Sequence, residues 1–84
     1  MLIQINRIDE NQKGVNFTVI NTGHITNYSV HDCQVLISYV STGCSTFGFD
    51  CNEHAATFAL ALSDIMVNKI RERKSSSFRI KIIL

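Results

Sequence analysis

The chain has 84 residues, of which 45% are hydrophobic and 18% charged, and it contains neither proline nor tryptophan. This composition is typical of a small globular domain and excludes a proline-rich or low-complexity chain. No stretch approaches the roughly 18 consecutive apolar residues of a membrane span, and the N-terminus lacks the basic and apolar regions of a signal peptide. We therefore expect one domain over residues 1–84 that does not engage a membrane.

The net charge of +1 conceals two halves of opposite sign. Residues 1–64 carry two basic and six acidic side chains, for −4, whereas residues 65–84 carry six basic side chains and one acidic side chain, for +5. The six basic residues are Lys69, Arg71, Arg73, Lys74, Arg79 and Lys81. A dipolar surface orients an approaching macromolecule, so these residues are the first candidates for a binding surface.

The N-terminal part of the chain predicts a β-hairpin. Residues 3–5 and 15–19 alternate between apolar and polar side chains on either side of a polar stretch at residues 9–14. In this pattern Phe17 and Val19 fall on the side that faces the core. We therefore expect two antiparallel strands at the start of the fold.

The next segment predicts further strands. Thr22-Gly23 marks a turn, and a short strand containing Tyr28 and Val30 follows it. Residues 33–40 have the pattern of a buried strand. Its core-facing side chains are Val35, Ile37 and Tyr39.

The clearest element is an amphipathic helix of roughly 20 residues that begins near Cys51. Asp50 and Glu53 have the spacing of a capping box, in which Asp50 caps free amides and Glu53 reaches back. Apolar side chains then recur every three or four residues as far as Ile70. The basic residues from Lys69 to Lys74 lie on the last helical turns in this interpretation, where positive charge opposes the helix dipole.

Residues 78–84 alternate again, which predicts a C-terminal strand with Arg79 and Lys81 on its outward face. The element order is therefore β-β-(β)-β-α-β. We predict a two-layer α+β domain in which one antiparallel sheet of about four to five strands packs on the single long helix.

The cysteines and histidines offer two chemical hypotheses. Cys51-x-x-His54 and His31-x-Cys33, with Cys44 in reserve, contain ligand types suited to zinc, but the spacing matches no zinc module. A thiol activated by a histidine would be a catalytic pair, but any chain with three cysteines and three histidines contains such combinations. We expect no metal, no cofactor and no enzymatic activity. An odd number of cysteines favours a reducing compartment, so we expect a cytoplasmic protein.

Phe47 and Phe49 flank Gly48 immediately before the predicted helix. They are candidates for a small exposed hydrophobic anchor, with a contact between Phe49 and the start of the helix as the alternative. The segment lacks the glycine and lysine spacing of a phosphate-binding loop, and Asp50 would repel an anion. We predict no nucleotide site.

The run Gly43-Cys44-x-Thr46-x-Gly48, followed by an acidic cap, Glu53 and an alanine-rich helix, resembles the strand-to-helix junction of the HicB-type antitoxins. The resemblance covers about a quarter of the chain. It implies a β-β-β-α-β topology and a protein partner, and it transfers no functional residue.

Our leading hypothesis is a non-enzymatic protein–protein interaction module, an inhibitor or regulator that docks on a larger macromolecular complex. Phage and mobile-element inhibitors of host defence nucleases, including anti-CRISPR proteins, have a similar profile, and this analogy suggests a nucleic-acid-processing defence complex as the partner. Two alternatives stay open: a nucleic-acid-binding protein that uses the basic C-terminal face, and an antitoxin-like partner-binding domain. Homodimer formation also stays open.

Overall fold

The computed structural model describes residues 1–8, 16–41 and 43–84. These residues form seven β-strands, one short 3-10 helix and one α-helix, so the predicted α+β class is confirmed. In chain order the elements are β1 (Leu2–Arg7), β2 (Thr18–Asn21), η1 (Thr22–His24), β3 (Ile25–His31), β4 (Gln34–Tyr39), β5 (Cys44–Gly48), α1 (Asn52–Asn68), β6 (Glu72–Lys74) and β7 (Phe78–Ile82).

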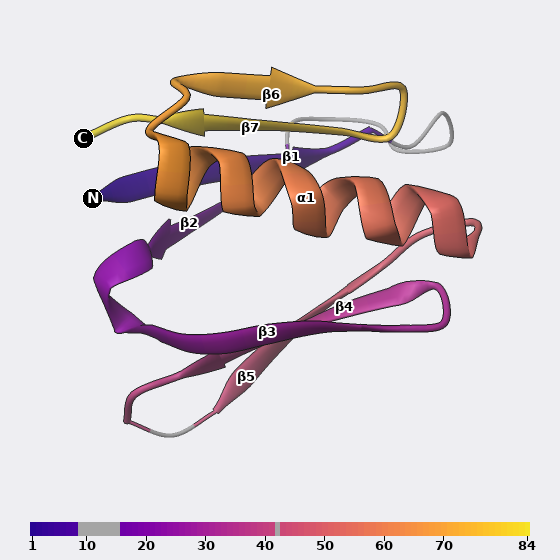
Figure 1. The fold of residues 1–84 in the computed structure, drawn as a ribbon, viewed down its shortest axis with the longest axis horizontal. Helices are drawn as coiled ribbons and strands as arrows, with labels where there is room; N and C mark the ends of the chain where they lie inside the picture. Colours follow the sequence, from indigo (N-terminus) through magenta and orange to yellow (C-terminus); the bar gives the residue numbers. More distant parts are fainter. Residues whose placement is uncertain (9–15, 42) are drawn as a thin grey trace.

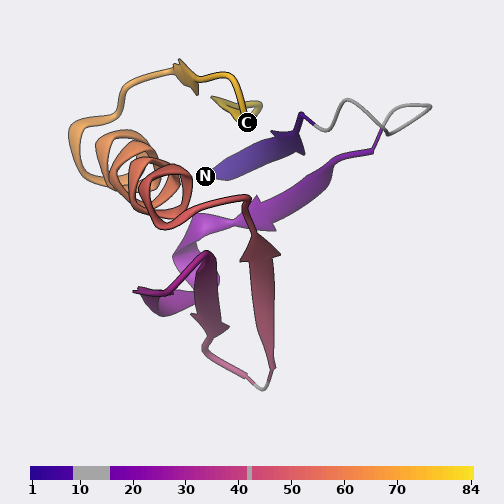
Figure 2. The ribbon, with the colours of Figure 1, turned by 90° about the vertical axis from the view of Figure 1, so that its right-hand side faces the viewer.

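The strands form two antiparallel sheets, whereas the sequence predicted one. Sheet A has the strand order β2-β1-β7-β6, and sheet B has the order β3-β4-β5. The helix runs between the two sheets in Figure 1 and is seen nearly end-on beside both of them in Figure 2. It contacts β6 and β7 of sheet A and β3 and β4 of sheet B. The helix therefore covers one face of each sheet.

β1 and β2 pair in antiparallel orientation, which confirms the predicted hairpin strands. Their predicted connection at residues 9–14 lies outside the described residues, as does Val15. Ile20 lies opposite Ile3 and both are buried, whereas Phe17 and Val19 are 55% and 44% exposed. The prediction that Phe17 and Val19 face the core is wrong, because a register shift of one residue exchanges the two faces of a strand.

One hydrophobic core joins the helix to both sheets. Phe58, in the middle of α1, is fully buried, and its ring centroid lies 5.3 Å from those of Phe47 and Phe78 and 5.1 Å from that of Phe49. The rings are tilted or edge-on, which are the orientations that aromatic pairs prefer. Because Phe47 belongs to β5 and Phe78 to β7, Phe58 connects sheet B to sheet A through the helix.

The ends of α1 differ from the sequence prediction. Cys51, and not Asp50, is the N-terminal cap, and its side chain makes no capping hydrogen bond, so the predicted cap at Asp50 is wrong. Lys69 adopts a left-handed conformation (φ 56°) directly after the helix, a common way for a helix to end. Arg73 and Lys74 consequently lie on β6 and not on the last helical turns. Within the described residues, the structure has no helix whose length and apolar character would suit a membrane span.

Candidate binding surface on sheet A

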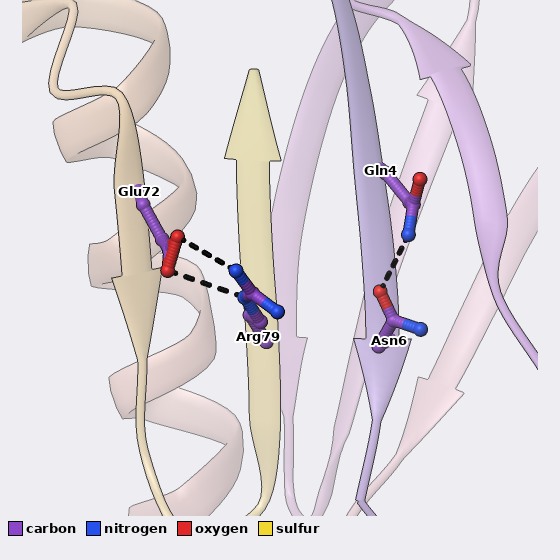
Figure 3. Close-up of polar contacts among 4 residues, drawn as sticks. All are labelled: Gln4, Asn6, Glu72 and Arg79. Carbon is purple, nitrogen blue, oxygen red and sulfur yellow. Dashed lines mark hydrogen bonds and ion pairs between the residues drawn. The ribbon is translucent and has the colours of Figure 1, made fainter. Parts of the chain in front are cut away.

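Sheet A has one face on the core and one face that points away from α1. Ile3 and Ile5 of β1 and Phe78 and Ile80 of β7 face the core, so the alternate residues of each strand point outward. We call this outward side the outer face of sheet A; Figure 3 looks onto it, with α1 behind the sheet. Its residues are Leu2, Gln4, Asn6, Val19, Asn21, Glu72, Lys74, Arg79 and Lys81.

An ion pair lies within this face. The Arg79 guanidinium donates from Nε to Oε2 of Glu72 at 3.2 Å and from Nη2 to Oε1 at 3.0 Å (Figure 3). In the register of β6 and β7, Lys74 lies directly opposite Arg79, and Lys81 lies directly opposite Glu72. Glu72 is therefore a single carboxylate among three cations.

Glu72 and Arg79 stabilise each other's charged forms. The hydrogen bond from Arg79 lowers the pKa of the Glu72 carboxyl, and the charges of Arg79, Lys74 and Lys81 lower it further, while desolvation opposes them. The same hydrogen bond and the Glu72 charge raise the pKa of the Arg79 guanidinium. Both partners of the ion pair are consequently charged at neutral pH, and the group keeps an excess of positive charge.

A row of amide side chains borders the charged group. Gln4 lies opposite Lys81 and Asn6 opposite Arg79 in the register of β1 and β7. The Gln4 Nε2 donates to Oδ1 of Asn6 at 3.0 Å (Figure 3), and the Asn6 Nδ2 donates to the backbone carbonyl of Asn16 at 3.4 Å. The outer face therefore combines fixed charges with neutral donors and acceptors.

The structure divides the six predicted basic residues into two sets of three. Lys74, Arg79 and Lys81 share the outer face of sheet A, as the alternation of residues 78–84 predicted for the last two. The other three are Lys69, Arg71 and Arg73.

These three residues have different surroundings. Lys69 follows the end of the helix, and its Nζ donates to the carbonyl of Met66 at 2.9 Å. Arg73 lies on the helix-facing side of β6, where its Nε donates to Oδ2 of Asp64 at 3.2 Å. Arg71 precedes β6, and its carbonyl accepts a bond from the amide of Ile82 at 2.9 Å. The six residues therefore do not form one surface.

The two phenylalanines before the helix are not exposed anchors. Phe47 is 6% exposed and Phe49 is half-buried against Phe58, so the interpretation of this pair as an exposed binding site is wrong. Of the aromatic side chains in the described residues, only Phe17 is exposed. It lies immediately before the edge strand β2.

Sequence reasoning did not name Gln4, Asn6 or Glu72 as site residues. The alternation of Gln4 and Asn6 with Ile3 and Ile5 contained a signal for the two amides, since it places them on the solvent side of the first strand. Glu72 is the one acidic residue of the basic C-terminal segment, but the sequence pattern places it at the helix end.

Cys33 and His31, one of the two pairs of candidate zinc ligands, bond to separate partners. The Cys33 thiol donates to Oδ1 of Asn52 at 3.2 Å, and Nε2 of His31 lies 2.9 Å from the hydroxyl of Ser29. All three cysteines are free thiols. Across residues 1–8, 16–41 and 43–84, no group of three or more His, Cys, Asp or Glu side chains is placed to hold a metal ion.

Comparisons of the chain with protein-family models, with curated proteins and with solved structures find no match. No family model therefore supports the resemblance of the junction between β5 and α1 to the HicB-type antitoxins.

Proposed function

We propose that this protein is a non-enzymatic binding domain that docks on another protein through the outer face of sheet A. The observation that carries the proposal is the Arg79–Glu72 ion pair, held by two hydrogen bonds on an outward-facing sheet surface. Arginine is enriched in protein interfaces and among the residues that dominate their binding energy. An arginine whose orientation is already fixed loses less conformational entropy when it binds.

The surroundings of the ion pair suit a protein partner. Amides lie on one side of it at Gln4 and Asn6, and Leu2 and Val19 add apolar surface on the same face. Protein interfaces of the non-obligate kind combine apolar, amide and charged groups in this way. In this proposal the docked domain acts as an inhibitor or regulator because it occupies a surface that the partner needs for its own activity.

A second candidate function is the binding of nucleic acid by the same face. Lys74, Arg79 and Lys81 lie together, and Phe17 is exposed beside the sheet. Proteins that bind single-stranded nucleic acid on a sheet surface use cations to contact phosphates and aromatic rings to stack with bases. Glu72 opposes this candidate, because it neutralises one of the three cations and the affinity for nucleic acid depends on how many cations can meet phosphates.

Two matched variants test the docking face independently of charge. Gln4→Trp places a bulky side chain in the middle of the outer face of sheet A, and Gln34→Trp places the same side chain on the side of sheet B that points away from the helix. Trp is tolerated in strands, so both variants are expected to fold, and circular dichroism checks this.

The measurement is affinity capture from a bacterial lysate, with and without nuclease, with bound proteins read by mass spectrometry and nucleic acid by absorbance. We expect one protein to be retained after nuclease treatment by the wild type and by Gln34→Trp, and to be lost from Gln4→Trp. Equal retention by all three proteins contradicts docking through this face. Retained nucleic acid without a protein would favour the second candidate.

A further inference from the structure

The charge on the outer face of sheet A exceeds what the sheet can neutralise by itself. Lys74 and Arg79 are like charges at directly opposed positions of neighbouring strands, an arrangement that destabilises a sheet. Glu72 is the only carboxylate among the nine residues of this face, and both of its oxygens bond to Arg79. Among the described residues the ammonium groups of Lys74 and Lys81 form no ion pair, so they are available to a partner.

The ion pair orients Arg79 without using all of its donors. Glu72 binds the Nε and Nη2 edge of the guanidinium, and among the described residues Nη1 has no hydrogen-bond partner. A guanidinium held along one edge presents a planar fork of defined orientation, which suits recognition of a second carboxylate. The side chain is 46% exposed, so such a partner can reach it.

We propose that the outer face of sheet A binds an acidic surface of the partner protein, whose carboxylates pair with Lys74, Arg79 and Lys81; this inference rests on the proposed docking function. The charge complementarity is local. Three cations surround one carboxylate, whereas the amides Gln4 and Asn6 beside them accept neutral polar groups.

Carboxylates fit this surface better than the phosphates of a nucleic acid. Single-stranded nucleic acid gains affinity from several phosphate contacts and from bases that stack on aromatic side chains. Glu72 neutralises one of the three cations of this face, which leaves few contacts for a phosphate backbone. The strands β1, β6 and β7 carry no aromatic side chain on this face, so bases would stack at most on Phe17 at the edge.

Two triple variants separate local recognition from general charge. The first, Lys74→Gln with Arg79→Gln and Lys81→Gln, removes the cations of the outer face. The control, Lys69→Gln with Arg71→Gln and Arg73→Gln, removes the same charge from basic residues that do not belong to this face. Both variants change the net charge equally, so any difference in binding reports position.

The probes are a short poly-L-glutamate peptide and a single-stranded oligothymidylate, titrated into nitrogen-15-labelled protein at one ionic strength and followed by amide chemical shifts. We expect poly-L-glutamate to shift amides of β1, β6 and β7. The outer-face triple variant should bind it about tenfold more weakly, the equivalent of about 1.4 kcal/mol, since each exposed ion pair contributes modestly. The control variant should bind within about twofold of the wild type.

Three outcomes overturn the inference. Equal weakening of both triple variants would show that only net charge attracts the peptide. Tighter binding of oligothymidylate than of poly-L-glutamate would assign the face to nucleic acid. Absence of shifts up to millimolar peptide would remove the acidic partner, yet docking through this face would stand if Gln4→Trp still abolished capture of a protein. If Gln4→Trp and Gln34→Trp both still captured the protein, the proposed docking through this face would itself be contradicted.

Discussion

The two sheets present outer faces of different chemistry, although both pack against the same helix. The side of sheet B that points away from α1 carries hydroxyls, amides, one imidazole and one thiol, and none of its nine residues is Lys, Arg, Asp or Glu. These residues are Asn27, Ser29, His31, Gln34, Leu36, Ser38, Cys44, Thr46 and Gly48. The outer face of sheet A carries four charged side chains at the same number of positions. The outward residues of a sheet in this fold can therefore all be uncharged.

Edge protection accounts for only part of this difference. Charged side chains on an edge strand hinder its pairing with another chain, and β6 is an edge strand that consists of Glu72, Arg73 and Lys74. Arg79 and Lys81 lie on β7, which is flanked by β1 and β6 and has no free edge. Arg79 pairs with Glu72, and the anionic partner proposed above would account for Lys81.

The substitution with the largest expected effect removes the core that both sheets share. Phe58→Ala should destabilise the fold by about 3–5 kcal/mol, since Phe58 is fully buried among aromatic rings from both sheets. That is a large share of the roughly 4–13 kcal/mol expected for a domain of this size. Urea unfolding followed by circular dichroism measures the loss.

The matched control lies on the same helix. Leu60 is 68% exposed, so Leu60→Ala should change the unfolding free energy by less than about 0.5 kcal/mol. If Phe58→Ala unfolded one sheet and left the other intact, the sheets would not share one cooperative core, and their outer faces would have to be compared as two separate units.

The elements that repeat a clear pattern could be predicted from the sequence. The helix, the C-terminal strand and β4 bury residues at regular spacing, so periodicity alone located them. β5 has Phe47 as its only buried residue, and β6 is three charged residues long, so neither carries an alternation of apolar side chains. The charged residues of β6 were therefore assigned to the helix end.

The division into two sheets depends on contacts between distant segments. The choice of Ile20 over Phe17 and Val19 as the buried residue of β2 is decided by its pairing with Ile3, which no local pattern contains. Composition identified the basic segment. Only the pairing of β6 with β7 shows that Lys74 lies beside Arg79 and that Arg73 lies on the opposite face of the sheet. The candidate site was thus predicted in residue type but not in arrangement.

A smaller loss of stability is expected when the polar contact between the helix and either sheet is removed. The hydroxyl of Tyr28 on β3 bonds to that of Ser63 in a partly buried position, whereas Arg73 on β6 reaches Asp64 in an exposed one. Tyr28→Phe should cost about 1 kcal/mol, the usual contribution of a hydrogen bond. Arg73→Gln should cost less, because an exposed ion pair is screened by solvent. Urea midpoints of the two variants, compared at one pH, provide the test. An equal or larger loss in Arg73→Gln would contradict the ranking.

Lys74→Glu tests whether the charges of sheet A serve binding at a cost in stability. The substitution exchanges the repulsion between Lys74 and Arg79 for an attraction, and the attraction between Lys74 and Glu72 for a repulsion. The two changes oppose each other, so the melting temperature should change by no more than roughly 4 °C, whereas binding of poly-L-glutamate should weaken. A larger fall in melting temperature would mean that Lys74 serves the stability of the sheet. Cys44→Glu, a new charge on the outward side of sheet B, serves as the control that should leave peptide binding unaffected.

The smallest expected effect is the pH dependence of stability that arises from Glu72. The pKa of Glu72 is lowered in the folded protein, chiefly by its hydrogen bond from Arg79, so its ionised form stabilises the fold. This contribution is fully present above the ordinary carboxyl pKa of 4.5 and is lost as the pH falls through the lower folded-state value. Carbon-13 NMR of the Glu72 carboxyl, recorded during an acid titration, measures that value.

Arg79→Gln sharpens the same measurement, because it removes the largest cause of the shift and leaves Lys74 and Lys81 in place. We expect the pKa of Glu72 to rise in this variant toward its ordinary value. An unchanged pKa would show that the two lysines, and not the guanidinium, hold Glu72 ionised. Arg79 would then be free to turn toward a partner with all of its donors, and the orientation of the fork would arise only on binding.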